Sequence, residues 1–253
     1  MRFFIELSYN GKYYHGWQIQ KKVKSVEEKL EYCLSKLLST SINIIGAGRT
    51  DKGVHARQMF AHFDFEEKLD SNLTKRLNIF LPKSIHVINI FPVKKYAHAR
   101  FHALSRTYKY YLISEKNPFI QDFSWYYIYP LDFIRMNKAS KILMRYKNFS
   151  SFCKKRKDRK SDNICEIYYA HWSKYKTHFC FTIQANRFLR NMVRSIIGTL
   201  VDIGRSKISI NEFIKILELE NPIYRNSQIA PPYGLFLTKI IYPEDIFYDS
   251  EKK

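Results

Sequence analysis

The residues with the clearest chemical potential lie in one decapeptide, GAGRTDKGVH, at residues 46–55. Its glycines permit turns and close backbone approaches that a Cβ atom would block. Within it Asp51 is flanked by Arg49 and Lys52, and nearby positive charge favours the ionised form of a carboxyl group. An ionised, well-positioned aspartate can act as a nucleophile or a base. We therefore predict an active-site loop, with a turn-forming or capping role for Asp51 as the alternative.

Other functions of this decapeptide fit less well. A dinucleotide-binding turn needs G-x-G-x-x-G, but Gly53 comes too late and Asp51 would repel a pyrophosphate. The G-K-[ST] ending of a P-loop is missing. Metal binding is a further alternative, since four potential ligands lie close in sequence: Asp51, His55, His62 and Asp64. Their spacing matches no recognised ligand set, so we predict no metal site.

A second group of charged residues lies on a helix predicted at residues 186–200, with Asn186 as its candidate N-cap. Apolar residues recur there at helical spacing, and Arg187, Arg190 and Arg194 line the flank beside this stripe. The repulsion between these arginines is relieved either by solvent or by a carboxylate and phosphates, which suit the guanidinium fork.

A third feature is the tyrosine-rich segment RTYKYY, predicted to be a strand. Arg106, Tyr108 and Tyr110 share one of its faces, because side chains alternate with period two. Stacking of an extruded base on a tyrosine contributes roughly 1 to 3 kcal/mol, which makes a base-handling role reasonable. Aromatic residues also simply favour strands, and for Tyr110 and Tyr111 we prefer that interpretation.

The chain of 253 residues carries a formal net charge of +20, with 43 Lys and Arg against 23 Asp and Glu. A polyanion, above all nucleic acid, is therefore the leading candidate partner. A genome rich in A and T would also inflate lysine, but it does not predict the arginines of these motifs. The basic run KKRKDRK at residues 154–160 is interpreted as a solvated loop, for which RNA contact and mere solvation are equally good explanations.

The rest of the composition narrows the class of protein. With 45% hydrophobic and 16% aromatic residues, the chain is not of the disordered class. Its four cysteines show no C-x-x-C spacing, which favours reduced thiols. The N-terminus lacks the apolar core of a signal peptide, and no run of about 18 apolar residues occurs. We expect a soluble, cytoplasmic protein that does not enter a membrane.

The elements that must position these residues follow from apolar periodicity and turn signals. Strands are predicted at residues 3–9, 59–65, 85–93, 107–113, 164–172, 179–184 and 235–241. Helices are predicted after a capping box formed by Ser25 and Glu28, and at residues 73–80 and 131–146. This order indicates two α+β domains, each with a mostly antiparallel sheet flanked by helices. We place them at residues 1–103, with the Asp51 loop, and 104–246, followed by a flexible tail at 247–253.

Taken together, the motifs resemble one family, the bacterial tRNA pseudouridine synthase A type. The resemblance covers nearly the whole chain, and its motifs occur in this order: YNGKYYHGWQ, GAGRTDKGVHA, HFDF, LNIFLP, HARFHALSRTYKYYLI, FSSF, IQANRFLRNMVRSIIGTLVDIG and APPYGLFL. Departures are small, since Lys52 replaces a usual alanine and Tyr233 a common histidine. The resemblance implies the pseudouridine synthase fold, with ferredoxin-like halves and an active-site cleft between them.

It also implies a reaction and a set of roles. Uridine would be detached from its ribose, turned and rejoined through carbon, without cofactor or metal. Asp51 would be the nucleophile, with attack on the base and attack on the ribose both open. Arg49 would hold the RNA backbone and target nucleotide, and Tyr108 would stack on the flipped uracil. Arg194 would pair with the Asp51 carboxylate, and Leu235 would form an apolar wall.

The expected partners follow from the same resemblance. A homodimer would act on tRNA at uridines of the anticodon stem-loop, at nucleotide positions 38, 39 and 40. Four further arginines are candidates for RNA contact: Arg57, Arg106, Arg187 and Arg190. A non-catalytic RNA-binding module is the main alternative, and a metal-dependent hydrolase is a more distant one.

Overall fold

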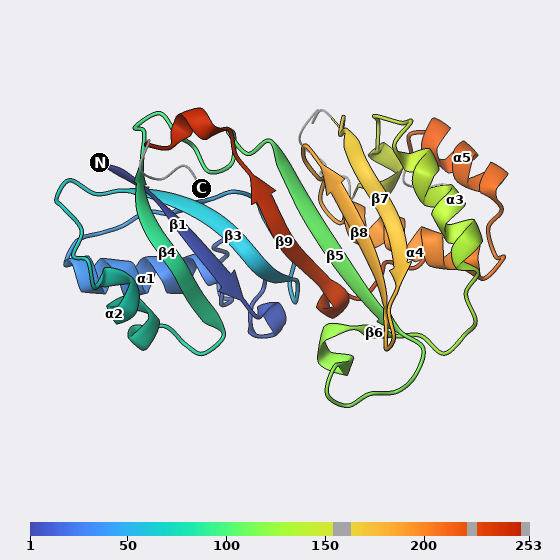
Figure 1. Cartoon of the computed structure of the whole chain (residues 1–253), viewed down its shortest axis with the longest axis horizontal. Coiled ribbons are helices and arrows are strands. Elements are labelled where there is room, and N and C mark those ends of the chain that lie inside the picture. The colour runs from blue at the N-terminus through green and yellow to red at the C-terminus, as the bar shows by residue number, and fades with distance from the viewer. Residues whose placement is uncertain (154–162, 222–226, 249–253) are drawn as a thin grey trace. The chain divides into compact units, whose positions relative to one another are not determined.

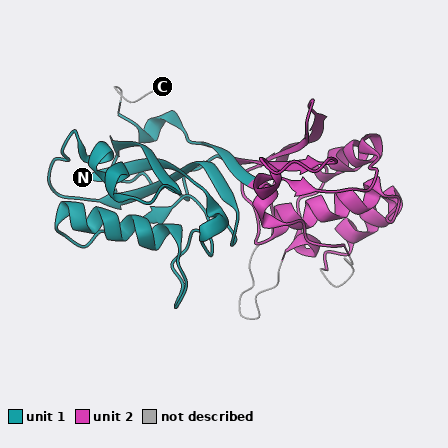
Figure 2. Cartoon of the chain, turned by 90° about the horizontal axis from the view of Figure 1, so that it is seen from below, with its two compact units in different colours: residues 1–105, 236–253 teal, residues 106–235 magenta. Residues whose placement is uncertain are grey.

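The computed structural model describes residues 1–153, 163–221 and 227–248, so the basic run at residues 154–160 lies outside the described residues. Contacts divide the chain into two compact units, Met1–Ser105 with Phe236–Lys253 and Arg106–Leu235 (Figure 2). Within the described ranges, no helix is both long and apolar enough to cross a membrane.

The first unit is built on a sheet with the strand order β4-β1-β3-β9 (Figure 1). Its strands are β1 (Arg2–Tyr9), β3 (His55–Asp64), β4 (Ile85–Val93) and β9 (Leu235–Ile241), and the short β2 (Ile45–Gly46) pairs with β3. β1 is antiparallel to β3 and β4, whereas β9 is parallel to β3. The helices α1 (Val26–Leu38) and α2 (Leu73–Phe80) pack against each other on this unit.

The start of α1 confirms the predicted capping box. The Ser25 side chain accepts from the Glu28 N–H at 3.2 Å, and the Glu28 carboxylate accepts from the Ser25 N–H at 3.4 Å. These bonds satisfy two backbone donors that a helix N-terminus leaves unpaired. The apolar stripe of the helix is fully buried at four positions: Val26, Leu30, Cys33 and Leu34.

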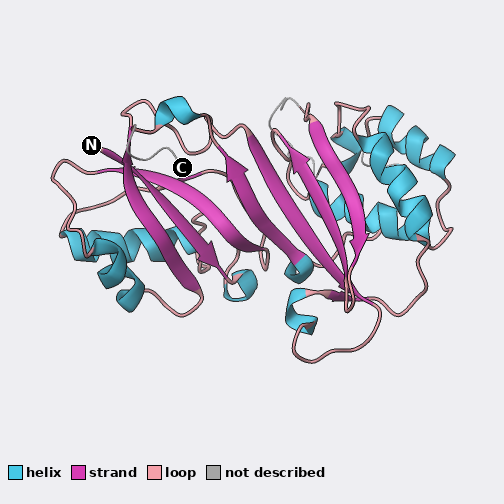
Figure 3. Cartoon of the chain, in the orientation of Figure 1, coloured by secondary structure: helices cyan, strands magenta, loops and turns pink. Residues whose placement is uncertain are grey.

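The second unit contains a sheet with the strand order β5-β8-β7. Figure 3 shows the strands in magenta and the helices in cyan. The antiparallel strands are β5 (Ser105–Ile113), β7 (Ile167–Lys174) and β8 (Phe179–Ala185), and β6 (Trp125–Tyr126) pairs in parallel with β5. The helix α3 (Phe133–Leu143) packs against β7, α4 (Met192–Gly204) and α5 (Ile210–Glu218). Both units thus combine helices with a mostly antiparallel sheet, which confirms the predicted α+β class.

The division of the chain differs from the predicted boundaries at 103/104 and 246/247. The segment from Phe236 onward groups with the first unit, because Phe236 pairs with His55 in the parallel β3–β9 ladder. Phe247, the first residue of the predicted tail, bridges to Val93 and lies edge-on to the ring of Phe4 at 6.4 Å. These contacts join residues far apart in sequence, so no local sequence pattern predicts them.

The predicted start of the arginine helix was wrong. The helix α4 begins at Met192, after Asn191 in a left-handed conformation with φ 62°. The Asn186 side chain instead accepts from the backbone N–H groups of Glu166 and Arg187, at 2.9 and 2.7 Å. Asn186 therefore stabilises a loop after β8, and Arg187 and Arg190 precede the helix.

Candidate active site

Asp51 lies on a turn that connects β2 to β3 in the first unit. Its backbone carbonyl accepts from the Val54 N–H at 3.1 Å, and Ala47, at the start of the loop, donates to the Phe60 carbonyl at 2.7 Å. The Asp51 side chain is half-buried. The predicted turn is confirmed, and it is tied at its beginning to β3.

The segment from Tyr9 to Gln18 holds this loop in place. The hydroxyls of Tyr9 and Thr50 are hydrogen-bonded at 2.8 Å in a buried position, and the Trp17 N–H donates to the Thr50 carbonyl at 3.3 Å. These bonds restrain both the side chain and the backbone of Thr50, the residue directly before Asp51. On the other flank, Gly53 donates to the Tyr14 carbonyl at 3.3 Å.

Two glycines allow this close packing. A Cβ atom on Gly16, whose φ is +93°, would lie 2.2 Å from the Thr50 carbonyl oxygen. A Cβ atom on Gly46 would lie 2.4 Å from Nε1 of Trp17. Both distances are far below van der Waals contact, and the φ of Gly16 is one that residues with a Cβ rarely adopt. The glycines of the two motifs thus let the segments approach each other at the flank of Asp51.

The two other candidate residues of this unit are exposed cations. The Arg49 Nε–H donates to Oε1 of Gln18 at 3.0 Å. The guanidinium of Arg57 lies over the ring of Phe236, 5.3 Å from its centroid, and His55 stacks on the same ring at 4.5 Å. Each arginine is therefore supported by a neighbouring side chain of the first unit.

Three of the four ligands considered for a metal site, His55, His62 and Asp64, are engaged in hydrogen bonds. His55 and His62 each accept a backbone N–H at Nδ1, at 3.1 and 3.2 Å, and both carboxylate oxygens of Asp64 accept from Arg2 at 2.8 Å. Burial, assisted by the positive charges of Arg2 and His98, lowers the pKa of His62 to about 4. Over the described ranges, no three His, Cys, Asp or Glu side chains gather as a metal site would require.

In the second unit, Tyr108 and Arg106 lie on β5, opposite Ile183 and Ala185 of β8. The ring of Tyr108 meets Phe188 edge-on at 5.2 Å, and Arg106 donates to the Asn186 carbonyl at 2.7 Å. Both side chains therefore contact the loop that follows β8, and both remain half-buried.

Tyr110 has a structural position, as we preferred from the sequence. Its ring is fully buried, and its hydroxyl donates to the Pro231 carbonyl at 3.0 Å. Burial holds the pKa of Tyr110 well above its usual value, so the hydroxyl keeps its proton. A Cβ atom on Gly234 would lie 2.8 Å from this ring. Tyr110 thus fixes the segment that leads into Leu235, itself only 5% exposed.

Arg194 is the candidate arginine that lies on α4. Its Nε–H donates to the Ala230 carbonyl at 2.7 Å, and its own carbonyl accepts from the Ala230 N–H at 3.1 Å. Two hydrogen bonds therefore join one turn of α4 to the segment before β9. Arg187 and Arg190 are exposed and lie in the loop before the helix.

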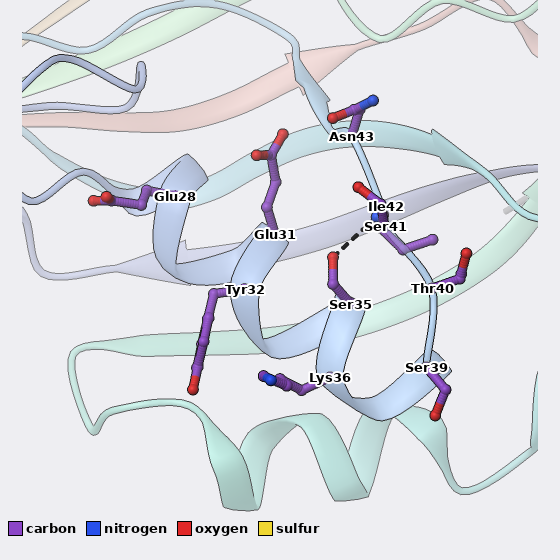
Figure 4. Close-up of a pocket in the computed structure, with 10 residues that line it drawn as sticks. All are labelled: Glu28, Glu31, Tyr32, Ser35, Lys36, Ser39, Thr40, Ser41, Ile42 and Asn43. Atoms are coloured by element: carbon purple, nitrogen blue, oxygen red, sulfur yellow. Dashed lines mark hydrogen bonds between the residues drawn. The ribbon is translucent and has the colours of Figure 1, made fainter.

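A hollow in the described surface lies elsewhere, between α1 and the chain that follows it (Figure 4). It measures about 710 Å³ and is lined by ten of the residues between Glu28 and Asn43. Ser35 accepts from the Ile42 N–H at 2.9 Å, and Glu31 accepts from the Ile44 N–H at 2.7 Å. None of the predicted site residues lines it, and its polar groups tie the chain leading to β2 onto α1.

Sequence reasoning underestimated the segment of residues 9–18. It was identified only as a family motif, although its residues make several of the hydrogen bonds that restrain the Asp51 loop. Its two glycines beside large aromatic residues, in NGKYYHGW, were the available signal, because such glycines often mark close backbone approach.

Comparison with known proteins identifies the family. A tRNA pseudouridine synthase family model matches residues 141–243. The tRNA pseudouridine synthase A of Azobacteroides pseudotrichonymphae is 52% identical over 247 residues, covering 97% of this chain and 98% of that protein. The tRNA pseudouridine synthase A of Bacteroides thetaiotaomicron is 46% identical over 256 residues, covering 100% and 94%. The sequence motifs and these full-length similarities show that the chain belongs to the tRNA pseudouridine synthase A family.

Proposed function

We propose that this protein isomerises uridine to pseudouridine in tRNA. The observation that carries the proposal is the 52% identity to a tRNA pseudouridine synthase A along almost the full length of both chains. The net charge of +20 is consistent with a polyanionic substrate. The half-buried carboxylate on a restrained turn supports an enzyme rather than a passive binding module.

In this reaction the N1–C1′ bond of uridine breaks and a C5–C1′ bond forms. The hydrogen on C5 is lost and N1 gains one, so the reaction is an isomerisation without net oxidation. Asp51 is proposed as the nucleophile, and attack on the base or on the ribose would use the same carboxylate. The hydrogen bonds to both flanks of Asp51 support this role, because a nucleophile must be held in position before the reaction.

The remaining roles follow from the family resemblance. Tyr108 would stack on the extruded uracil, and Leu235 would add an apolar wall. Arg194 would support the ionised Asp51 carboxylate, because positive charge favours the charged form of an acid. Arg49 would bind the RNA backbone near the target nucleotide. The exposed positions of Arg57, Arg187 and Arg190 are compatible with further phosphate contacts.

We also propose the anticodon stem-loop, at nucleotide positions 38, 39 and 40, as the target, and a homodimer in the cytoplasm as the active form. These finer statements rest on the resemblance alone. Sedimentation of the protein with and without tRNA, and mapping of pseudouridines in tRNA from a strain lacking the gene, test them directly.

The central experiment compares wild-type protein with Asp51→Asn and Asp51→Ala on tRNA transcripts. We expect pseudouridine formation to fall by about 10³-fold or more, because removing a nucleophile leaves only binding and positioning. Affinity for tRNA should stay within a few-fold of the wild type. Asp70→Asn, which changes an exposed carboxylate paired with Arg76, is the matched control and should keep full activity. Activity retained in Asp51→Asn would exclude the proposed role, and wild-type protein that binds tRNA without modifying it would favour the RNA-binding module.

A further inference from the structure

A buried carboxylate lies behind the Asp51 loop and has no role in the proposed reaction. Glu27, in the first turn of α1, is only 4% exposed. Its Oε1 accepts from Nε1 of Trp17 at 3.1 Å, and its Oε2 accepts from Nε2 of Gln18 at 2.5 Å and from the Ile19 N–H at 2.8 Å. A carboxylate this deeply buried requires such partners, since a buried charge without them is strongly destabilising.

These bonds determine which way the Gln18 amide points. Both oxygens of Glu27 accept hydrogen bonds, Oε1 from the Trp17 indole and Oε2 from the Ile19 N–H and from Nε2 of Gln18, so the NH₂ group of Gln18 faces Glu27 although burial raises the pKa of this carboxyl group. The amide oxygen then points the other way, where it accepts from the Arg49 Nε–H at 3.0 Å. If the amide were reversed, its NH₂ group would face the guanidinium donor and its oxygen would face the carboxylate. Glu27 therefore imposes the one amide orientation that can bind Arg49.

The same carboxylate also orders the opposite end of the loop. Its bond to Nε1 holds the indole of Trp17, which is 1% exposed, and this indole packs against Gly46. The Glu27 N–H in turn donates to the Trp17 carbonyl at 3.0 Å. The start of the loop at Gly46 and its cation at Arg49 are thus both joined to one buried group.

We infer that Glu27 and Gln18 are positioning residues, which orient the Arg49 guanidinium for contact with the RNA backbone. The inference rests on the proposed function, because the role of Arg49 in RNA binding comes from there. Neither residue needs to touch the substrate. Glu27, in the first turn of α1, fixes the Gln18 amide by a hydrogen bond, and the Gln18 amide in turn fixes the exposed Arg49 guanidinium.

A double-mutant cycle tests this inference. Gln18→Met keeps the length of the side chain but removes both hydrogen bonds of the amide. Alone it should raise the KM and the Kd for tRNA by about 3- to 10-fold while kcat changes less, because the interaction lost belongs to binding. Combined with Arg49→Ala it should add little further, since interacting residues are not additive. Combined with Arg57→Ala, in contrast, its effect should multiply.

Gln20→Met is the matched control in the same segment, because the hydrogen bonds of the Gln20 amide go to the His15 and Gln18 carbonyls. It should leave KM and Kd unchanged. A readout independent of activity is the hydrogen exchange of the Arg49 Nε–H measured by ¹⁵N NMR, which should be faster in Gln18→Met and unchanged in Gln20→Met. Glu27→Ala should also accelerate this exchange, because the Gln18 amide would lose its fixed orientation.

The outcomes distinguish a failure of the proposed function from a failure of the positioning role. If wild-type protein forms no pseudouridine, the proposed function fails, whatever the exchange rates show. If the wild type is active but Gln18→Met and Arg49→Ala multiply in KM, or if Arg49 exchange is the same in Gln18→Met, the positioning role is overturned. A loss of stability in urea with unchanged KM would also overturn it, because Gln18 would then only support the fold.

Discussion

Gly198 of α4 lies against the carbonyl oxygen of Gln228, so closely that a Cβ atom at residue 198 would be 1.6 Å from that oxygen. One turn earlier on the same helix, Arg194 makes two hydrogen bonds with Ala230. The approach at Gly198 therefore allows the segment after Gln228 to lie along α4. The orientation of the Arg194 guanidinium depends on that segment.

Gly198→Ala should consequently affect both stability and activity. The added methyl group must displace the backbone at Gln228, and overpacking of this kind costs about 1 to 3 kcal/mol of unfolding free energy. Pseudouridine formation should fall further than stability explains, because Arg194 would lose its carbonyl partner. Urea denaturation and single-turnover assays measure the two effects. Gly48→Ala is the stability control, since no atom lies within 4 Å of the Cβ position there. Equal stability of the two variants would contradict the prediction.

A comparison of two tyrosine variants distinguishes an effect on the position of the Asp51 loop from an effect on stability alone. Tyr9→Phe and Tyr14→Phe each remove one hydroxyl hydrogen bond of 2.8 Å, to Thr50 and to Ser84 respectively. Each should lower the free energy of unfolding by about 1 kcal/mol. Only Tyr9→Phe should lower kcat, because Thr50 directly precedes Asp51. Urea titration and steady-state kinetics of both variants check this, and an equal fall of kcat in both would show that the Tyr9 bond has no special effect.

The elements with strong local signals could be predicted from the sequence. The capping box at Ser25 and the apolar stripe behind it specify α1, and the bounds predicted for α2, residues 73–80, are those observed. A second capping box, formed by Ser209 and Glu212, begins α5. We did not predict this helix, although the S-x-x-E pattern was present.

Other features depend on tertiary contacts and could not be predicted. Asn186 has the chemistry of an N-cap, but its side chain accepts from the N–H of Glu166, the residue before β7, and α4 begins later, at Met192. The bond from Arg49 to Gln18 joins residues 31 positions apart, and no periodicity connects them. Asp51 was identifiable because it lies in a loop of unusual composition. The glycines of residues 9–18 indicated a close backbone approach, but the individual hydrogen bonds that hold Asp51 could not be predicted, because a buried hydrogen bond leaves no signature in sequence spacing.

His62 should make stability depend on pH. Its pKa is lowered from 6.5 to about 4 by burial and by the charges of Arg2 and His98, with Asp64 and the Ile45 backbone opposing. Between these two pH values the unfolded chain binds a proton that the folded protein does not. The stability therefore falls as the pH drops from 6.5 towards 4, by up to about 1.4 kcal/mol for each pH unit.

Urea titrations at about pH 7 and about pH 4.5 measure this dependence. His62→Asn is the test variant, because its Oδ1 can accept the Ala99 N–H as Nδ1 of the histidine does at 3.2 Å. The loss of stability between the two pH values should be smaller in this variant. The pKa of Asp64 is lowered by its hydrogen bonds to Arg2, so the stability that this carboxylate contributes is lost only at lower pH. Identical losses in both proteins would assign the pH dependence to other groups.

The net charge of +20 leads to a last prediction, on the salt dependence of tRNA binding. Each phosphate neutralised by a cation releases counterions, so the logarithm of the binding constant should fall steeply and linearly with the logarithm of salt concentration. Arg49→Ala should reduce that slope by about one, because one phosphate contact is lost. Arg76→Ala is the control with an unchanged slope, since the Arg76 guanidinium is paired with Asp70 at 3.1 Å. Filter binding across a salt series gives all three slopes. A flat response of the wild type would instead attribute the excess of lysine to genome composition, because a surface that binds RNA through its charges cannot be insensitive to salt.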